Sequence, residues 1–438
     1  MNFIYGLNKS GISIINLLKK NNEIFHIWDD NENVRKKIKK IFKNKLFLNP
    51  LKVNLLKYTN IYVTPGISFK KNIFNKFRNK NNLKRDLSLY ISKIKKEKIV
   101  AITGTNGKST STKLIGDILK NKNTFVGGNI GKPLCEAFIS QKKYKYHVIE
   151  LSSFQLENIK NFTSNISVIT NLSIDHTDRY KNINDYIKQK KNILTKSGIN
   201  ILSIDDKYSK RIFSENNNYK KISFSTKSTN ADIYIKDKFI FDKIFKKNKI
   251  FQLNNISKDL QGDFNKQNIL VAYICSKILK IPEKMFLNSI MNFKGLPFRF
   301  QLIYERKNLK IINNSKSTNI DSAINSIKNY KNIYLIIGGR AKEKNFDEFI
   351  KYKKLINCIY LYGESGEFIY NKLKNRINIK LFKNLNSVVN NLFKDLQEFK
   401  KDKYVLFSPA CSSYDQYKNF EERGETFTNL INKQIKKI

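Results

Sequence analysis

Residues 98–114 read KIVAITGTNGKSTSTKL and join three local patterns in one short segment. The apolar run from Ile99 to Ile102 is typical of a buried strand, and it breaks at Gly104 before a helix-like stretch. Glycines at Gly104 and Gly107 let backbone N–H groups approach an anion, and the following helix points the positive end of its dipole at the turn. The segment therefore predicts a phosphate-binding loop.

Two side chains add to this prediction. Lys108 supplies a cation beside the loop, and Ser109 can offer its hydroxyl to Mg²⁺. The loop meets the usual P-loop motif only in part, because that motif has a glycine where Ile102 stands. Its position between a strand and a helix favours phosphate binding over an ordinary glycine turn.

Composition indicates a globular chain. With 438 residues, 40% hydrophobic and 27% charged, the chain is long enough for three domains. We find no secretory signal pattern and no run of 18 apolar residues, so we expect no membrane span. The four cysteines lack CxxC spacing, which argues against disulfides or a thiolate zinc site and is typical of a cytoplasmic protein.

The net charge of +47 raises the possibility of a nucleic-acid partner. The lysines, however, are spread along the whole chain among many Asn, Ile, Phe and Tyr, all residues with A- and T-rich codons. A base-composition bias produces such a mixture, and no RNA-recognition, zipper or zinc-finger signature accompanies it. We therefore expect no nucleic-acid partner, although the charge would attract anionic substrates.

Strand and helix patterns alternate along the chain, which predicts an α/β fold. The chain opens with a strand at 2–6, a helix at 12–20 and a second strand at 23–30, a βαβ unit. Its glycines lack the middle glycine of the dinucleotide fingerprint, so NAD binding is only weakly indicated. A strand at 60–64 ends in a turn containing Gly66, at the edge where such sheets bind ligands.

A helix near 84–94 precedes the phosphate loop, and we place domain boundaries to give domains at 1–91, 92–294 and 295–438. The third domain again alternates strands and helices. We interpret the Lys- and Asn-rich residues 205–248 as surface loops and strands.

Polar residues follow two strands of the second domain. Glu150 ends the strand YHVIEL, and Asn171 ends ISVITN, with Asp175 and His176 just beyond it. The carboxyl ends of parallel strands lie on one edge, where the phosphate loop also lies. We therefore expect Glu150 and His176 to reach the Mg²⁺ of a bound nucleotide.

Lys190 lies on the apolar stripe of a predicted helix at 182–194, whereas its neighbours Lys188 and Lys191 face elsewhere. Buried lysines are rare, and burial beside other cations favours the neutral amine. A neutral amine can add CO₂ to become a carbamate, an anionic ligand for a second Mg²⁺. A lysine that snorkels from the edge of the stripe is the alternative.

Seven motifs, in this order, resemble the Mur ligases, and in particular their D-glutamate-adding branch. They are GTNGKST (104–110), GGNIGKPL (127–134), ELSSFQLE (150–157), NLSIDHTDRY (171–180), GLPFRF (295–300), INNSKSTN (312–319) and SPACSSYDQYKNFEERG (408–424). The resemblance covers essentially the whole chain.

This resemblance implies a Rossmann-like N-terminal domain for the UDP end of the substrate, a central P-loop-type ATPase domain, and a C-terminal Rossmann-like domain for the amino acid. It implies a cytoplasmic, monomeric ligase of peptidoglycan synthesis that uses ATP and two Mg²⁺ ions. UDP-N-acetylmuramoyl-L-alanine and D-glutamate would be its substrates, and an acyl phosphate its intermediate.

The resemblance also implies roles for individual residues. Catalytic roles fall to Lys108, Glu150, His176 and a carbamylated Lys190; metal ligation falls to Ser109, Glu150, His176 and Lys190. ATP contacts fall to Gly104, Thr105, Asn106, Gly107, Lys108, Ser109, Thr110, Asn265, Asn268, Arg299 and Asn314. Substrate contacts fall to Ser10, Asp29, Gly66, Asn129, Ser152, Ser153, Lys316, Thr318, Lys342, Ser413 and Phe420.

Some positions depart from the family pattern. Phe264 and Phe298 stand where relatives usually carry His, and Asn314 replaces an expected Asp. Asn keeps an acceptor but loses the charge of an Asp, so these departures bear on the ATP contacts. Two alternatives stay open: a folylpolyglutamate synthetase of the same superfamily, or a basic nucleic-acid-binding protein with a vestigial ATPase.

Overall fold

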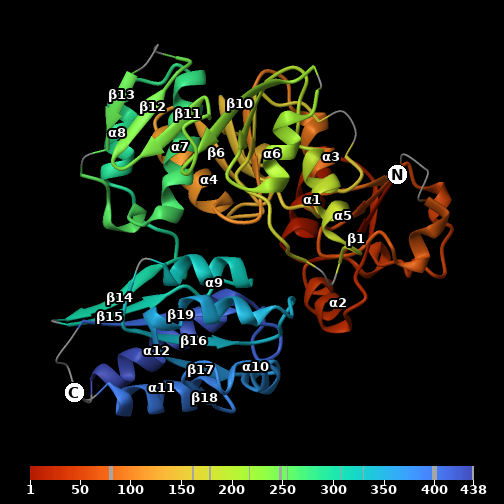
Figure 1. Cartoon of the computed structure of the whole chain (residues 1–438). Coiled ribbons are helices and arrows are strands. Elements are labelled where there is room, and N and C mark those ends of the chain that lie inside the picture. The colour runs from red at the N-terminus through yellow and green to blue at the C-terminus, as the bar shows by residue number, and fades with distance from the viewer. Residues whose placement is uncertain are drawn as a thin grey trace. The chain divides into compact units, whose positions relative to one another are not determined.

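We describe a computed structural model of the chain. It describes residues 1–77, 82–159, 162–176, 179–216, 218–245, 249–253, 255–306, 308–328, 330–396 and 402–436, without the side chains at 45, 72, 75, 76, 249–251 and 264. The chain divides into two compact units. The first holds residues 1–172, 182–254 and 267–290, and the second holds 173–181, 255–266 and 291–438. Figure 1 labels many of the elements of both units.

The first sheet is small and parallel, in the order β2-β1-β3-β4. Its strands are β1 (Asn2–Tyr5), β2 (Phe25–Trp28), β3 (Asn60–Val63) and β4 (Leu83–Lys84), and its helices are α1 (Lys9–Lys20) and α2 (Glu32–Lys39). The βαβ opening is therefore confirmed, with α1 starting three residues earlier than the pattern predicts. A Cβ on Gly11 of α1 would lie 1.9 Å from the carbonyl oxygen of Gly6, so glycine lets the helix approach the end of β1.

The second sheet has nine strands, in the order β13-β12-β11-β10-β9-β8-β5-β7-β6. The strands are β5 (Lys98–Thr103), β6 (Thr124–Gly128), β7 (Tyr146–Glu150), β8 (Ile166–Ile169), β9 (Ile199–Ser203), β10 (Lys220–Ser225), β11 (Ile233–Lys236), β12 (Phe239–Asp242) and β13 (Lys249–Gln252). From β6 to β11 the pairs are parallel, while β11, β12 and β13 pair antiparallel. Because β5 lies between β7 and β8, the residues that follow these three strands meet at one edge.

Six helices belong to this part of the chain: α3 (Asp86–Lys93), α4 (Lys108–Ile118), α5 (Ile183–Lys191), α6 (Lys207–Ser214), α7 (Asp263–Ile278) and α8 (Glu283–Met291). Residues 205–248, expected as loops and strands, also contain α6. Its amphipathic sequence KYSKRIFS places Ile212 in the core although most of its residues are polar.

The third sheet has six strands, in the order β14-β15-β19-β16-β17-β18. Its strands are β14 (Gln301–Arg306), β15 (Leu309–Asn313), β16 (Ile333–Gly338), β17 (Ile356–Tyr362), β18 (Ile379–Leu381) and β19 (Lys403–Ala410). Strands β14 and β15 pair antiparallel and the other pairs are parallel. Its helices are α9 (Ile320–Ile327), α10 (Gly366–Leu373), α11 (Leu385–Asp395) and α12 (Phe420–Ile435).

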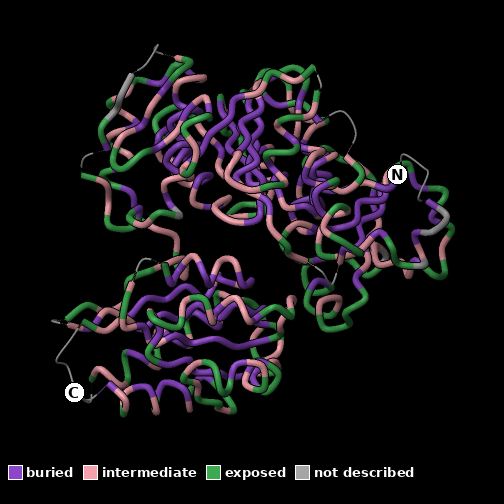
Figure 2. The backbone as a smooth tube through the Cα atoms, in the orientation of Figure 1, coloured by how far each residue is buried: buried purple, intermediate pink, exposed green. Residues whose placement is uncertain are grey.

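Helices cover both faces of the third sheet, so its central strands β15, β19, β16 and β17 are mostly buried, whereas the edge strands β14 and β18 are not (Figures 1 and 2). One apolar cluster joins α9 and α10 to one face, and another joins α11 and α12 to the opposite face. This three-layer arrangement explains why strands such as IYLIIG are continuously apolar rather than alternating. In the described part of the chain, no helix combines the length and the apolar character that a bilayer crossing needs.

Candidate functional site

The turn between β5 and α4 depends on two glycines. Gly104 has φ +148° and Gly107, the residue before α4, has φ +82°. A Cβ on Gly104 would lie 1.9 Å from Thr170 Oγ1, and one on Gly107 would lie 2.5 Å from Asn268 Oδ1. Neither position can accept a side chain without movement, so both the backbone angle and the close packing require glycine.

Asn171, at the end of β8, holds this turn in place. Its side-chain oxygen accepts a hydrogen bond from Asn106 N at 2.9 Å, and its Nδ2 donates to Asn106 O at 3.1 Å. Its backbone oxygen accepts from Thr105 N at 2.8 Å. The neighbouring strand therefore fixes the loop from the side, as the shared edge predicts.

Glu150 lies on the opposite side of the loop, at the end of β7. The Ser109 hydroxyl donates to Glu150 Oε2, and Asn129 Nδ2 donates to Glu150 Oε1 at 2.7 Å. Both Ser109 and Glu150 are 1% exposed. A buried hydroxyl and carboxylate in contact at a helix N-terminus are the hard oxygen donors that Mg²⁺ prefers, so these two residues fit that ion. Within the described ranges, no group of three or more His, Cys, Asp or Glu could hold a metal by itself.

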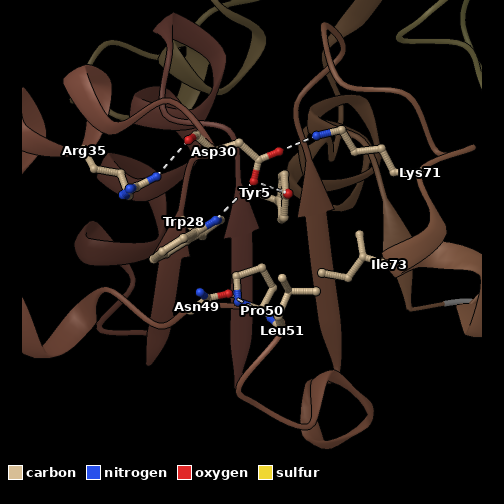
Figure 3. Close-up of a pocket in the computed structure, with 9 residues that line it drawn as sticks. All are labelled: Tyr5, Trp28, Asp30, Arg35, Asn49, Pro50, Leu51, Lys71 and Ile73. Carbon is tan, nitrogen blue, oxygen red and sulfur yellow. Dashed lines mark hydrogen bonds and ion pairs between the residues drawn. The ribbon is translucent and has the colours of Figure 1, made fainter.

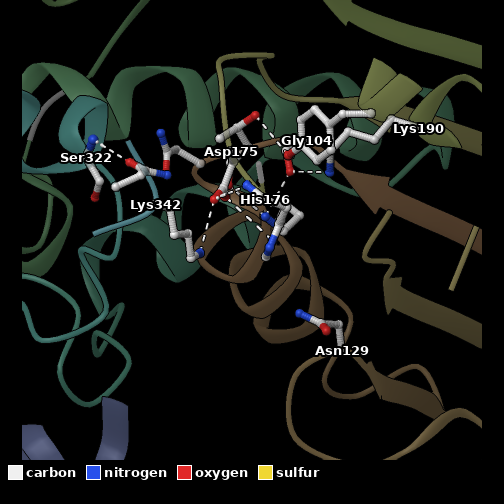
Figure 4. Close-up of polar contacts among 12 residues, drawn as sticks. Gly104, Asn129, Asp175, His176, Lys190, Ser322 and Lys342 are labelled. Atoms are coloured by element: carbon white, nitrogen blue, oxygen red, sulfur yellow. Dashed lines mark hydrogen bonds and ion pairs between the residues drawn. The ribbon is translucent and has the colours of Figure 1, made fainter. Parts of the chain in front are cut away.

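Lys190, on α5, is buried with 2% exposure, which confirms the predicted inward stripe. Its Nζ donates to Gly104 O at 2.7 Å and to Thr103 Oγ1 at 3.2 Å (Figure 4). The Tyr186 ring lies 4.8 Å from the amine. A snorkelling lysine would keep its amine in water, so the snorkelling alternative is wrong.

Lys108 contacts the same loop. Its Nζ donates to Gly104 O at 2.8 Å and to Thr105 O at 2.7 Å. Two lysine amines thus share the carbonyl oxygen of Gly104. Thr110, the third residue of α4, is only partly buried.

Asn268 and Asn265 both lie on α7. Asn268 Oδ1 accepts from Ser111 Oγ at 2.9 Å, which ties α7 to α4. Asn265 belongs to the second unit, where its Nδ2 donates to the carbonyls of Asp259 and Gln261.

Ser152 and Ser153 follow β7. Ser152 N and Oγ both donate to Gln155 Oε1 at 3.1 Å, and Gln155 Nε2 donates to Asp86 Oδ2 at 3.2 Å. Ser153 is buried, whereas Gly66, in the turn after β3, is exposed. Burial raises the pKa of Asp86 above its ordinary value.

At the edge of the first sheet, Asp29 accepts from Leu7 N at 2.8 Å and from Asn31 N at 2.9 Å. Both of its oxygens therefore organise loops at the ends of β1 and β2. Ser10 is half-buried at the start of α1.

The pocket in Figure 3 has a volume of about 460 Å³ and lies on the same sheet. Asp30 accepts from Tyr5 OH, Lys71 Nζ and Trp28 Nε1, and Arg35 stacks 4.5 Å from the Trp28 ring. Burial raises the pKa of Asp30, but the bonds from Lys71 and Tyr5 outweigh it and hold this pKa below its usual value. The pocket is lined by Tyr5, Trp28, Asp30, Arg35, Asn49, Pro50, Leu51, Lys71 and Ile73.

His176 belongs to the second unit and has φ +54°. Its backbone N donates to Asp175 Oδ1 at 2.8 Å, and Asp175 pairs with Lys342 Nζ at 3.1 Å (Figure 4). Glu343, next to Lys342, accepts from Ile320 N at 3.1 Å. Burial, aided by the charges of Asp175 and Asp321, raises the Glu343 pKa to about 7.

Asn314 is committed to contacts inside the second unit. Its Oδ1 accepts from Phe300 N at 3.2 Å, and its Nδ2 donates to Ser326 Oγ at 2.8 Å and Ser408 Oγ at 3.2 Å. The Asn314 amide therefore joins three segments, a role for which its donor is needed. Phe298 has φ +59°, and a Cβ on Gly424 would lie 2.4 Å from its ring.

The remaining predicted residues of the second unit are Arg299, Lys316, Thr318, Ser413 and Phe420. Lys316 Nζ lies 4.0 Å from the Phe420 ring centre.

Sequence reasoning missed Arg423, which is fully buried and donates to Ser315 O at 2.7 Å and Cys411 O at 3.0 Å. It joins two of the segments that carry the predicted amino-acid contacts. The side chain of Phe264 lies outside the described residues.

The chain is similar to proteins of one enzyme family. Residues 102–276 match the Mur ligase middle domain. The UDP-N-acetylmuramoylalanine–D-glutamate ligase of Rickettsia prowazekii is 37% identical, with 98% of this chain and 96% of the relative covered. The enzyme of the same name from Buchnera aphidicola is also 37% identical, with the same coverage of both chains.

Solved structures show the same fold at low identity. The UDP-N-acetylmuramate–alanine ligase of Thermotoga maritima matches with a TM-score of 0.59 and 16% identity over 99% of both chains. A pseudomurein peptide ligase type C from Methanothermus fervidus matches with a TM-score of 0.60 and 19% identity, again over 99% of both chains.

Proposed function

This chain belongs to the Mur ligases, among the UDP-N-acetylmuramoylalanine–D-glutamate ligases, and we propose from that membership and from the site geometry how its residues act. The protein is an ADP-forming ligase that joins D-glutamate to UDP-N-acetylmuramoyl-L-alanine in peptidoglycan synthesis. The substrate carboxylate attacks the γ-phosphorus of ATP and ADP leaves. The D-glutamate amine then attacks the acyl carbon, and phosphate leaves with one of the original carboxylate oxygens.

The phosphate loop carries the first step. Backbone N–H groups at the start of α4 point at the turn, and Lys108 lies within reach of any phosphate bound there. Such a transfer needs positioning and neutralisation of charge rather than covalent help. Thr105, Asn106, Ser109 and Thr110 complete the loop, and Asn268, Asn265, Arg299 and Asn314 are the further ATP residues of this proposal.

Ser109 and Glu150 would hold one Mg²⁺, and His176 with a carbamate on Lys190 a second; when bound, these ions neutralise phosphate charge. The observation that carries the assignment is the Ser109–Glu150 contact, because it places a carboxylate beside the phosphate loop in a buried setting. Asn129 orients that carboxylate through its 2.7 Å bond.

The carbamate itself fits the contacts of Lys190. Two ammonium groups that share Gly104 O repel each other, whereas a carbamate on Lys190 would attract Lys108. A carbamate nitrogen keeps one N–H, which can still donate to Gly104 O. The lysine would then serve as an anionic ligand without losing its place in the fold.

We assign the substrates to the three predicted domains. The UDP end meets the edge of the first sheet at Ser10, Asp29 and Gly66, and the muramoyl-alanine end meets Asn129, Ser152 and Ser153. D-Glutamate meets the third domain, where cations and hydroxyls suit its two carboxylates and amine. Its proposed residues are Lys316, Thr318, Lys342, Ser413 and Phe420.

Phosphate release tests this function. With ATP, Mg²⁺ and UDP-N-acetylmuramoyl-L-alanine, we expect release that depends on D-glutamate and is at least tenfold slower with L-glutamate. Equal rates with both isomers would contradict the amino-acid assignment. No release with either isomer would contradict the ligase function as a whole.

A further inference from the structure

Arg85 directly precedes α3, in the segment that joins the first sheet to the second. Among the described residues of the first unit, it is the largest fully buried charged side chain. Its NH1 donates to three backbone carbonyls at the end of β3 and in the turn after it: Val63 at 3.0 Å, Thr64 at 2.8 Å and Ile67 at 2.9 Å. This turn contains Gly66 and follows β3 of the first sheet.

The other side of the guanidinium contacts the segment that follows β7 of the second sheet. Its NH2 donates to Glu157, whose side chain is 12% exposed, at the end of ELSSFQLE. The Phe69 ring covers the guanidinium at 3.5 Å. A buried charge is costly unless it is paired and hydrogen-bonded, and Arg85 is both.

Asp86 extends this link. It accepts from Gln155 Nε2 at 3.2 Å, and Gln155 in turn accepts from both the backbone and hydroxyl of Ser152. Arg85 and Asp86 therefore connect the Gly66 turn to the Ser152–Glu157 segment. We call these residues the Arg85 clamp: Arg85, Asp86, Gln155 and Glu157.

The geometry points to a positioning role: the Arg85 clamp fixes the spacing between the nucleotide end and the muramoyl end of the substrate site. This inference rests on the proposed function, in which Gly66 and Ser152 contact one long substrate. A planar guanidinium contacts the carbonyls and the carboxylate at once, which a lysine ammonium cannot do. A rigid spacing places the substrate carboxylate for attack at little entropic cost.

Steady-state kinetics of the full chain test the inference with two substitutions of Glu157. Glu157→Met removes the acceptor, and Glu157→Gln keeps a neutral acceptor of the same shape. We expect Glu157→Met to lower kcat/KM for UDP-N-acetylmuramoyl-L-alanine at least tenfold, while the Kd values of UDP and ADP change less than twofold. Glu157→Gln should recover activity to within threefold of the parent chain.

Glu283→Gln provides the control, because it also neutralises the acid of a partly buried ion pair, with Lys277 at 3.1 Å, in the same unit. It should leave kcat/KM within twofold. If Glu157→Met weakens UDP, ADP and the full substrate equally, or leaves kcat/KM unchanged, the positioning role is wrong. If the parent chain itself shows no D-glutamate-dependent turnover, the proposed function fails instead.

Discussion

The amines of Lys108 and Lys190 both donate to the carbonyl oxygen of Gly104, at 2.8 Å and 2.7 Å. Lys108 belongs to α4, the helix that begins at the phosphate loop. Lys190 belongs to α5 and lies 82 residues later in the sequence. Their meeting at one oxygen defines the positive side of the loop. It also gives the proposed carbamate of Lys190 a physical reason, because a negative group there would relieve the repulsion.

Lys190→Ala should abolish turnover, because it removes both the bond to Gly104 and the proposed anionic ligand. A short carboxylic acid such as formate or acetate, added in solution, should restore part of the activity. Lys188→Ala is the matched control, since Lys188 is exposed on the same helix and should retain full activity. Full activity of Lys190→Ala would contradict the proposal that Lys190 carries a carbamate.

Glu150→Gln should lower kcat by two orders of magnitude or more and raise the Mg²⁺ concentration needed for half-maximal rate, because a neutral amide binds Mg²⁺ more weakly than a carboxylate does. The amide is close in shape and can still contact Ser109. Thermal unfolding should therefore change little. An unaltered Mg²⁺ dependence would show that Glu150 does not ligate the ion.

Gly107→Ala should weaken ADP binding and destabilise the fold by about 1–2 kcal/mol or more, since alanine at φ +82° is strained. Its Cβ would also lie 2.5 Å from Asn268 Oδ1. Urea unfolding and ADP titration measure the two effects. Gly295→Ala is the comparison, because its Cβ would make only ordinary 3.4 Å contacts with Asp259. Equal stability of the two variants would argue against the strain.

His147 on β7 should make the fold sensitive to mild acid. It is buried among aromatic rings, with Tyr90 OH 2.7 Å from its Nδ1, and burial lowers its pKa to about 4. The unfolded chain binds this proton near pH 6.5, so the stabilising contribution is complete above that pH and is lost as pH falls toward 4. When the pH falls from 7.5 to 5.0, the free energy of unfolding should decrease by about 2 kcal/mol through this residue.

Urea unfolding of the parent chain and of His147→Phe at the two pH values isolates this effect. The variant loses a bond to Tyr90 at both pH values, so only the difference between them is compared. We expect that difference to be about 2 kcal/mol smaller in the variant. Identical pH differences in the two proteins would contradict a neutral buried His147.

Glu343→Gln should stabilise the second unit at alkaline pH. The pKa of Glu343 is raised to about 7 in the fold. The contribution of this side chain to folding stability is therefore complete below pH 4.5 and is lost as pH rises through 7. Gln keeps an acceptor for Ile320 N and carries no charge. The free energy of unfolding of the variant, relative to the parent chain, should be higher at pH 8 than at pH 4.5 by on the order of 1–2 kcal/mol after solvent screening. Urea unfolding at the two pH values measures this difference. A variant less stable at pH 8 would contradict this.

Local patterns predicted the parts of the site that lie along one strand, turn or helix. The turn at Gly104, the end of β7 at Glu150 and the inward side of α5 at Lys190 all follow from periodicity and from the edge rule for parallel strands. Buried charges at Arg85 and Arg423 could not be predicted, because their acceptors are backbone carbonyls distant in sequence. A sequence shows no signal for such acceptors.

The antiparallel pairing of β11, β12 and β13 and the antiparallel edge strand β14 were not predicted. We expected surface loops and strands in residues 205–248, but strand preference depends on the partner strand, so the local sequence carried no signal for the antiparallel pairing.

Transfer of an oxygen isotope tests the central claim most directly. UDP-N-acetylmuramoyl-L-alanine labelled with ¹⁸O at both carboxylate oxygens is incubated with ATP, Mg²⁺ and D-glutamate, and the released phosphate is analysed by mass spectrometry. Because the carboxylate attacks phosphorus and phosphate later leaves from carbon, each phosphate formed should carry one labelled oxygen. Amide product accompanied by unlabelled phosphate would contradict the acyl phosphate and the roles built on it.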